Sequence, residues 1–173
     1  VNSTGVLNEG DGNASRDEST LVVRNSTIAA NTSIGVRIGG VDGSFSMRNR
    51  VVANNGNGDC EISISADLNL DRYNMDSDDS CELGDGTSNY PGVEPYLAPP
   101  AYRGGFAMSA WPLNRSPVID LGHPVIGAIG CEEEDQDFNE RPVDFDGNGN
   151  ARCDVGAIEL DDDVIFHDPY ERL

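Results

Sequence analysis

An internal repeat of 24 residues constrains the fold of this chain more than any other feature of its sequence. The segment Val23–Asn31 (VRNSTIAAN) aligns with Met47–Asn55 (MRNRVVANN), so that Asn25 falls on Asn49. A period of about 20 to 30 residues with short β-branched runs is typical of one coil of a parallel β-helix, and Asn suits its corners because it tolerates left-handed backbone. We therefore predict an all-β fold, a short parallel β-helix of two to three coils followed by an irregular, disulfide-bonded C-terminal cap.

Changes in composition divide the chain into four parts. The first is polar and rich in Gly and Asn, the second carries the repeat, the third begins at a Pro-rich stretch, and the last is acidic. The predicted division is 1–19, a polar leader or loop; 20–90, the β-helix coils; 91–160, a capping region with a calcium-like loop; and 161–173, an acidic tail. Because an uncapped β-helix ends in open strand edges, we expect apolar side chains of the third part to cover one end of the coils. The candidates are Phe106, Met108, Trp111 and Leu113.

Four cysteines in a small, acidic, Gly-rich chain predict two disulfides and an oxidising compartment. Three pairings are possible. Pairing Cys60 with Cys81 and Cys131 with Cys153 is the simplest, because each pair then encloses a polar loop of about twenty residues. A zinc site is the alternative, but the spacings are not Cys-x-x-Cys and the chain has only two histidines.

The charge balance limits the partners of this chain. It has 31 acidic residues against 11 basic ones, all of them Arg, for a net charge of −20. Such a surface repels nucleic acid and anionic membranes, so we expect no nucleic-acid partner. No segment approaches the roughly 18 to 20 apolar residues of a membrane-spanning helix, and we therefore expect no direct membrane insertion.

A candidate calcium loop begins at Asp144. The sequence DFDGNGN places oxygen-bearing side chains at alternate positions, as the first half of an EF-hand loop does around a hard cation. Val155 stands where an EF-hand has its bidentate Glu, so Asp154 or Glu159 would have to supply that ligand. The same letters fit a polar turn that binds no metal, because Asp-Gly and Asn-Gly pairs favour turns. We predict Ca²⁺ as a cofactor, and the predicted ligands are Asp144, Asp146, Asn148, Asn150 and Asp154.

Five motifs follow one another over residues 20–160 in the order in which a known family has them. They are VVRNSTIAAN, DCEISISADLNL, PYLAPPAYRGG, RSPVIDLG and CDVGAIE, of which the last is the most specific. In these motifs the chain resembles the choice-of-anchor (type Q-like) C-terminal domain of bacterial surface proteins related to polymorphic outer-membrane proteins. It departs from that family at Arg115, where the family has Gly. The resemblance implies the end of a right-handed β-helix, secretion, and no catalytic residues.

These features together predict a structural or adhesive module of the bacterial cell surface or extracellular space, and not an enzyme. Enzymes built on β-helices need a long groove that carries a Lys or Arg base or a carboxylate pair, whereas this chain has no Lys and few coils. The expected partner is a second copy of the chain, in a homo-oligomer or filament, or a surface glycan. The alternative is a carbohydrate-binding or carbohydrate-processing module of a larger secreted β-helix protein, with Trp111 and Tyr102 as stacking contacts.

Overall fold

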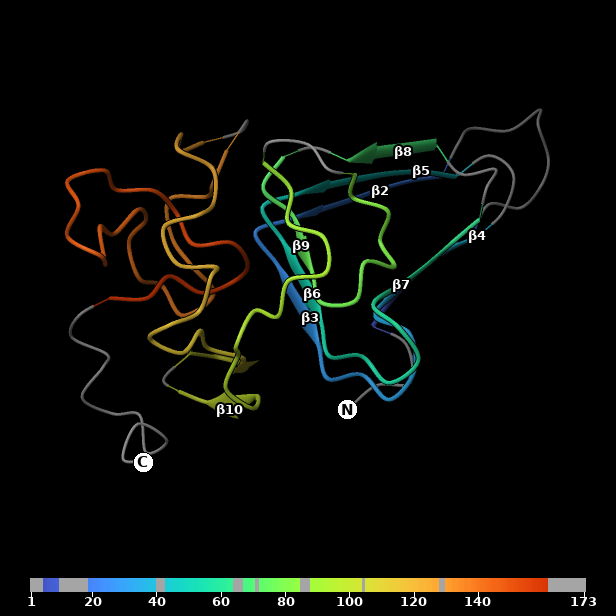
Figure 1. The fold of residues 1–173 in the computed structure, drawn as a ribbon, viewed down its shortest axis with the longest axis horizontal. Helices are drawn as coiled ribbons and strands as arrows, with labels where there is room; N and C mark the ends of the chain where they lie inside the picture. Colours follow the sequence, from blue (N-terminus) through green and yellow to red (C-terminus); the bar gives the residue numbers. More distant parts are fainter. Residues whose placement is uncertain are drawn as a thin grey trace.

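The computed structural model describes residues 5–9, 19–39, 43–63, 67–70, 72–84, 88–103, 105–127 and 130–161. The regular structure in these ranges consists of β-strands, which confirms the predicted all-β class (Figure 1). Within the same ranges there is no helix that could cross a membrane. Most of the predicted leader and all but the first residue of the predicted acidic tail lie outside the described residues.

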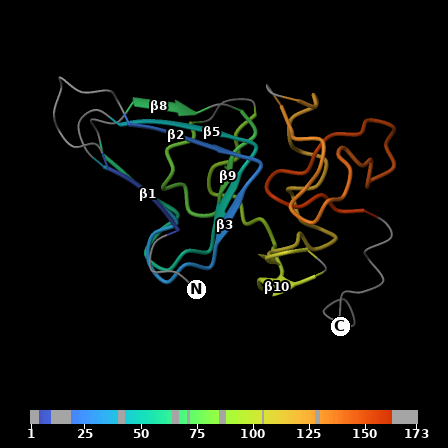
Figure 2. The ribbon, with the colours of Figure 1, turned by 180° about the vertical axis from the view of Figure 1, so that it is seen from behind.

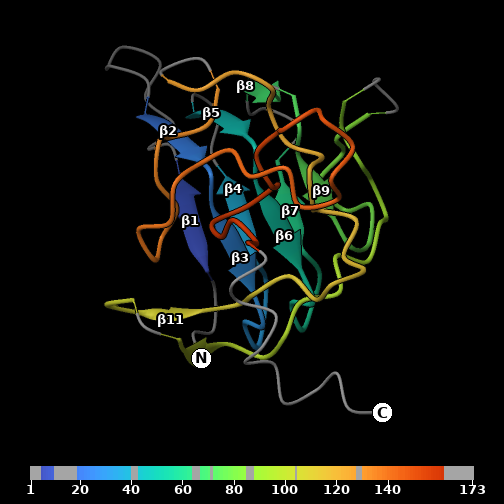
Figure 3. The same ribbon diagram turned by 90° about the vertical axis from the view of Figure 1, so that its left-hand side faces the viewer.

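The strands of the first half of the chain form three parallel sheets that the chain visits in rotation. The first sheet contains β1 (Val6–Glu9), β4 (Val36–Gly39) and β7 (Cys60–Ile62); the second contains β2 (Ser19–Arg24), β5 (Gly43–Arg48) and β8 (Asp67–Leu70); the third contains β3 (Thr27–Ala29), β6 (Val51–Ala53) and β9 (Met75–Asp76). We call one passage through the three sheets a circuit. Figure 3 shows the three circuits following one another across the view, from β1 to β4 to β7 and likewise in the other two sheets.

The strand register explains the sequence repeat. Thr27 pairs with Val51, which in turn pairs with Met75, and Val36 pairs with Cys60. In each of these pairs the partners are 24 residues apart, so that one repeat of the sequence is one circuit of the chain. The side chains of one circuit therefore lie directly beside their counterparts in the next, which is why like residues recur at this spacing.

The corner between the second and third sheets has left-handed backbone in every circuit. It is formed by Asn25, Asn49 and Tyr73, with φ angles of 43°, 50° and 65°. Asn is favoured in this conformation because its short side chain forms local hydrogen bonds that offset the steric cost of a Cβ atom. The Asn49 Nδ2 group also donates to Asn25 Oδ1 over 2.8 Å, so the repeated Asn links consecutive circuits.

The main hydrophobic core lies inside the three sheets. Its buried members are Val36, Ile38, Phe45, Met47, Val52, Cys60, Cys81 and Leu83. The disulfide between Cys60 and Cys81 belongs to this core and confirms the first expected pairing. After β9 the chain folds back across the last circuit, where Tyr90 forms a parallel bridge with Met75 and Leu83 is buried. The third circuit is therefore covered by the segment that immediately follows it.

The region from residue 101 onward lies against the outer face of the third sheet, beside the circuits and not over their end (Figures 1 and 3). Its only named strands are β10 (Ala101–Tyr102) and β11 (Met108–Ser109), which pair antiparallel within the described residues. Val118 and Val155 bury the outward-facing Val51. The second disulfide, Cys131–Cys153, joins two irregular segments of this region and confirms the other expected pairing.

Two expectations were wrong, one about the apolar residues that cover the coils and one about the start of the chain. Phe106 is 92% exposed and Met108 is 49% exposed, so these side chains do not cover an end of the coils. That position is taken by Leu83 and Cys81, which reach it without a long connection. Residues Val6–Glu9, expected in a polar leader or loop, form β1 because Val6 packs against the interior core and the strand pairs with β4.

Candidate functional site

The loop predicted to bind calcium is closed by its own hydrogen bonds. Asp144 accepts backbone N–H bonds from Asn148 (3.1 Å) and Gly149 (2.8 Å). Asp146 accepts the same Asn148 N–H over 3.0 Å, and Asn148 Oδ1 accepts the N–H of Asn150 over 2.8 Å. The positive φ of Gly149, 82°, allows the tight turn that brings these groups together. The sequence thus builds a compact turn with its carboxylates gathered on one side.

Asp120 joins this loop from a distant part of the chain. One carboxylate oxygen from each of Asp120, Asp144 and Asp146 lies within 4.8 Å of the other two, so the three could hold a hard cation. Asp120 Oδ2 accepts the Asp146 N–H over 3.1 Å, whereas Asp120 Oδ1 is buried and accepts no hydrogen bond from the described residues. Burial and the two neighbouring carboxylates raise the pKa of Asp120. We call these three residues the acidic cluster.

Asp154, the fifth predicted calcium ligand, lies beside the acidic cluster but faces away from it. Its Oδ1 accepts the Asp120 N–H over 2.8 Å and its Oδ2 accepts the Leu160 N–H over 2.8 Å. Both oxygens are thereby directed at backbone, and the residue is only 1% exposed. The structure therefore brings Asp144 and Asp146 together with Asp120 in place of Asp154. The motif RSPVIDLG contained Asp120, but no sequence spacing relates it to the loop that it reaches.

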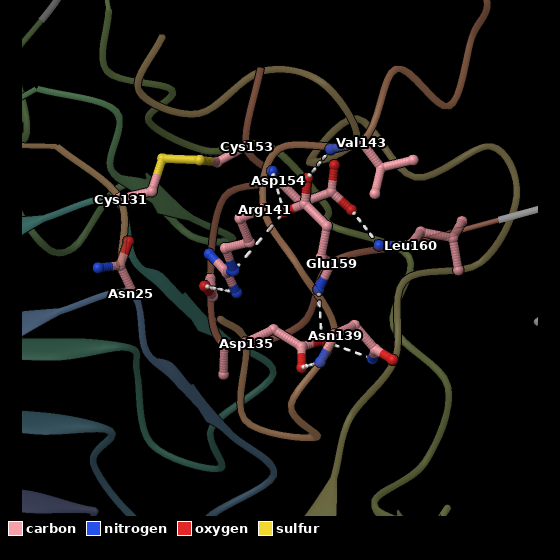
Figure 4. Close-up of polar contacts among 12 residues, drawn as sticks. Asn25, Cys131, Asp135, Asn139, Arg141, Val143, Cys153, Asp154, Glu159 and Leu160 are labelled. Atoms are coloured by element: carbon pink, nitrogen blue, oxygen red, sulfur yellow. Dashed lines mark hydrogen bonds and ion pairs between the residues drawn. A yellow bond between two sulfur atoms is a disulfide. The ribbon is translucent and has the colours of Figure 1, made fainter. Parts of the chain in front are cut away.

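Asp154 belongs instead to a buried network of charged side chains, which Figure 4 shows pointing toward one another. Glu159 Oε2 accepts the Asp154 N–H over 2.9 Å and lies 3.6 Å from Arg141 Nε. Glu159 Oε1 accepts the Val143 N–H over 2.8 Å, and Asp135 Oδ2 accepts the Glu159 N–H over 2.9 Å. We call Asp135, Arg141, Asp154 and Glu159 the buried network.

Burial controls the ionisation of this network. It raises the pKa of Glu159 to about 7 and raises the pKa of Asp154 well above its usual range, and the negative charge of Glu159 further raises the pKa of Asp154. Burial likewise lowers the pKa of Arg141, although the nearby carboxylates oppose that shift. The carboxylates mainly accept backbone N–H bonds in a region without regular sheets. The chemistry of the network is therefore that of a structural clasp, which holds irregular backbone together.

A second group of buried charges lies at the third circuit. The side chain of Arg50 is completely buried, and burial lowers its pKa to about 9 against the attraction of Asp76 and Asp59. Asp76 accepts the backbone N–H groups of Cys81 (2.8 Å) and Gly92 (2.9 Å). These bonds attach the segment after β9 to the last circuit, and sequence reasoning missed them because the acidic run around Asp76 resembles a solvated loop.

The two predicted carbohydrate contacts have different environments. Trp111 is half-buried, and its indole Nε1 donates to Ser109 Oγ (2.9 Å) and to Asp137 Oδ2 (3.0 Å). Tyr102 is 75% exposed. Nearby, the rings of Phe106 and Phe138 meet edge to face with centroids 5.6 Å apart. We call Tyr102, Phe106, Met108 and Phe138 the aromatic patch; all four are exposed.

The two disulfides are typical of proteins from oxidising compartments outside the cytoplasm. Comparison with known proteins adds no relative to this description: no family model, no curated protein and no solved structure matches the chain.

Proposed function

We propose that this chain is an extracellular structural or adhesive module formed by the end of a right-handed parallel β-helix. The observation that carries the proposal is the agreement between the 24-residue sequence repeat and the register of the three parallel sheets. The chain leaves β2 and returns to the same sheet as its parallel neighbour β5. Connections of this kind are right-handed in almost all known proteins. A solenoid of stacked circuits is stiff and elongated, which suits a scaffold.

The buried charges support a structural role. Glu159, Asp154 and Asp76 have raised pKa values, a property that often marks catalytic groups. Each of them, however, has its oxygens directed at backbone N–H groups of irregular segments. Their ionisation therefore affects the stability of the fold, and we propose no catalytic residue among them.

Adhesion can be tested with beads to which the oxidised chain is attached through a single point of the protein. We expect them to be retained under flow on surfaces coated with polysaccharide or with the chain itself. The variant Phe106→Ser/Phe138→Ser removes two exposed rings of the aromatic patch, leaves the buried core unchanged, and tests whether this patch takes part in retention. Beads that are retained on none of these surfaces, together with a monomeric sedimentation profile at every concentration, would contradict the adhesive proposal.

A second candidate function is carbohydrate binding, which the exposed aromatic patch favours. Sugar rings stack on exposed aromatic faces, and Tyr102 and Phe106 offer such faces. Tyr102→Ala should abolish retention of the chain on the polysaccharide that binds it. Leu7→Ala, at an exposed apolar residue of β1, is the matched control. Equal retention of both variants would exclude the aromatic patch as a sugar site.

Calcium binding by the acidic cluster is part of the proposal. Carboxylate oxygens are the preferred ligands of Ca²⁺, and a cation would relieve the mutual repulsion of Asp120, Asp144 and Asp146. The buried Asp120 Oδ1, which accepts no hydrogen bond from the described residues, supports a cation at this place. The ion would link the loop to the segment that contains Asp120.

A further inference from the structure

The row of corner residues ends differently at its two ends. In its middle, Asn49 Nδ2 donates to Asn25 Oδ1 (2.8 Å) and to the carbonyl oxygen of Asp154 (3.0 Å). At the third circuit the row ends in Tyr73, whose ring lies under the guanidinium of Arg152 at 5.3 Å and against the ring of His123. At the first circuit it ends in Asn25, whose Nδ2 is buried and donates to no acceptor in the described part of the chain.

A buried amide donor without an acceptor is costly, because it loses its hydrogen bonds to water and gains none. Asn25 Nδ2 occupies the place in the first circuit that Asn49 Nδ2 occupies in the second, where it donates to the Asn one circuit earlier. By the same geometry, the missing acceptor of Asn25 is a side-chain oxygen one circuit before it. The row is therefore complete at Tyr73 and one residue short at Asn25.

The strands of the first circuit point to the same end. Among the described strands, β1, β2 and β3 each pair on one side only, and all three are the outermost strands of their sheets (Figures 2 and 3). The outer edge of β9, at the opposite end, is bonded to the segment that follows it, because Asp76 N–H donates to the Tyr90 carbonyl and Tyr90 N–H donates to the Asn74 carbonyl. The two ends of the sheets are thus not equivalent.

An apolar hollow opens beside these edges. It has a volume of about 650 Å³ and is lined by Val6, Val22, Val23, Arg24, Ser26 and Ile28. Val6, Val23 and Ile28 are only half-buried, although they pack against the interior core. In the next circuit, the counterparts of Val23 and Ile28 are Met47 and Val52, which are completely buried under the first circuit. The first circuit thus leaves partly exposed the apolar positions that, in the second circuit, are buried by the circuit before it.

We propose that this end of the sheets is a strand-addition site for an extended segment with the pattern of residues 19–31. The segment pairs in parallel with β2 and β3, places an Asn beside Asn25 so that its Oδ1 accepts from Asn25 Nδ2, and fills the hollow with aliphatic side chains. Main-chain hydrogen bonds supply the affinity, and the Asn pair selects the register, because a shift by one residue would turn the apolar side chains outward. The inference rests on the proposed β-helix and names its partner.

The test uses a labelled peptide with the sequence STLVVRNSTIAAN, a copy of residues 19–31, and the intact oxidised chain. We expect saturable binding, measured by fluorescence anisotropy, with a dissociation constant below ~1 mM. Hydrogen exchange should slow at β2 and β3 and stay unchanged at β5 and β6. A peptide in which Asn25→Leu removes the acceptor should bind about tenfold more weakly, which is the loss expected for one buried hydrogen bond.

A protein variant provides the matched test from the other side. Asn25→Asp keeps the oxygen that accepts from Asn49 and tolerates left-handed backbone, but it replaces the donor Nδ2 by an oxygen. We expect a lower melting temperature, because an ionisable oxygen is now buried without a donor, and about tenfold weaker binding of the unchanged peptide at a temperature where the variant is fully folded. Unchanged hydrogen exchange at β5 and β6 separates lost recognition from lost folding.

Three results would overturn the inference. The first is no binding of the unchanged peptide, the second is binding that ignores both Asn changes, and the third is a dimer of the free chain in which β2 and β3 are already protected. The third result would assign the edge to a second copy. Adhesion of coated beads is measured separately, so a chain that adheres but does not take up the peptide would refute this inference alone.

Discussion

Arg141 Nε lies 3.6 Å from Glu159 Oε2, and both side chains are completely buried. The pKa of Glu159 is nevertheless raised, to about 7, and that of Arg141 is lowered. Removal from water therefore outweighs the attraction between the two charges, as is common for buried ion pairs. The backbone N–H groups of Val143 and Asp154 supply the remaining bonds to Glu159, so this pair links the charge state of the protein to its fold.

The first prediction concerns pH. Because the pKa of Glu159 is higher in the folded chain than its usual value of 4.5, the folded state binds this proton more tightly than the unfolded state does. That contribution to stability is complete below about pH 4.5 and is lost as the pH rises through about 7. The raised pKa of Asp154 acts in the same direction. We expect the melting temperature to be several degrees lower at pH 8 than at pH 5, measured by calorimetry at constant ionic strength.

A variant separates the contribution of Glu159 to the pH dependence of the melting temperature from that of the repulsion among surface carboxylates. Glu159→Gln removes the titrating group while it keeps the size of the side chain. We expect its melting temperature to depend less on pH than that of the parent, although it is lower at pH 5 because an amide NH₂ now faces a backbone N–H. An unchanged pH dependence would assign the effect to other carboxylates.

The second prediction compares a buried ion pair with an exposed one. Arg141→Met leaves Glu159 buried without its cation, and we expect a loss of about 3 to 5 kcal/mol in the free energy of unfolding. The loss should be larger at pH 8 than at pH 5, because Glu159 is then more often ionised. Arg37→Met breaks the exposed pair with Glu61, whose atoms are 2.6 Å apart, and should cost less than about 1 kcal/mol. Urea denaturation of both variants measures the difference, and equal losses would refute it.

The third prediction concerns the corner residue Asn49. Asn49→Ala removes two donated bonds, to Asn25 and Asp154, and one accepted from the His123 N–H. Alanine also lacks the side-chain amide whose local hydrogen bonds offset the steric cost of a Cβ atom at a φ of 50°. We expect a loss of about 3 kcal/mol or more in the free energy of unfolding.

Asn54→Ala is the matched control for this corner. Asn54 has a similar φ, 57°, but its side chain is exposed and, within the described residues, donates to Glu94 alone. Its replacement should cost about 1 kcal/mol, mainly from the left-handed backbone. A similar cost for both variants would show that the buried bonds of Asn49 contribute little.

The fourth prediction concerns calcium. A ligand that binds only the folded state raises its stability, so Ca²⁺ should raise the melting temperature by several degrees and EDTA should reverse the change. Asp146→Asn, which removes a charge from the acidic cluster, should abolish most of the response. Glu132→Gln, at an exposed acid outside the cluster, should not. A response that is equal in both variants, or absent in the parent, would refute calcium binding at this place.

Much of the sheet region could be predicted from the sequence because its contacts repeat. Val23–Asn31 and Met47–Asn55 carry like residues at the same positions, and parallel stacking requires that like positions meet. The disulfide pairing was predictable for a related reason, since each bridge closes a loop between cysteines adjacent in the sequence. In β6 all three residues, Val51, Val52 and Ala53, are apolar. Such a run is typical of a strand that is buried on both faces. It indicates that another part of the chain, here the region after residue 100, covers the outer face of the third sheet.

The sequence by itself therefore determined the all-β class, the length of one circuit and the corner asparagines, because each of these depends on neighbours at a fixed spacing. It favoured, among three possibilities, the disulfide pairing that the structure has. Only the tertiary structure decided that Asp120 meets Asp144 and Asp146, that Asp154 turns toward Glu159, and that Phe106 stays exposed. These contacts join irregular segments through single hydrogen bonds and burial. No periodic pattern records such contacts, because each is set by where the backbone of the whole region comes to rest.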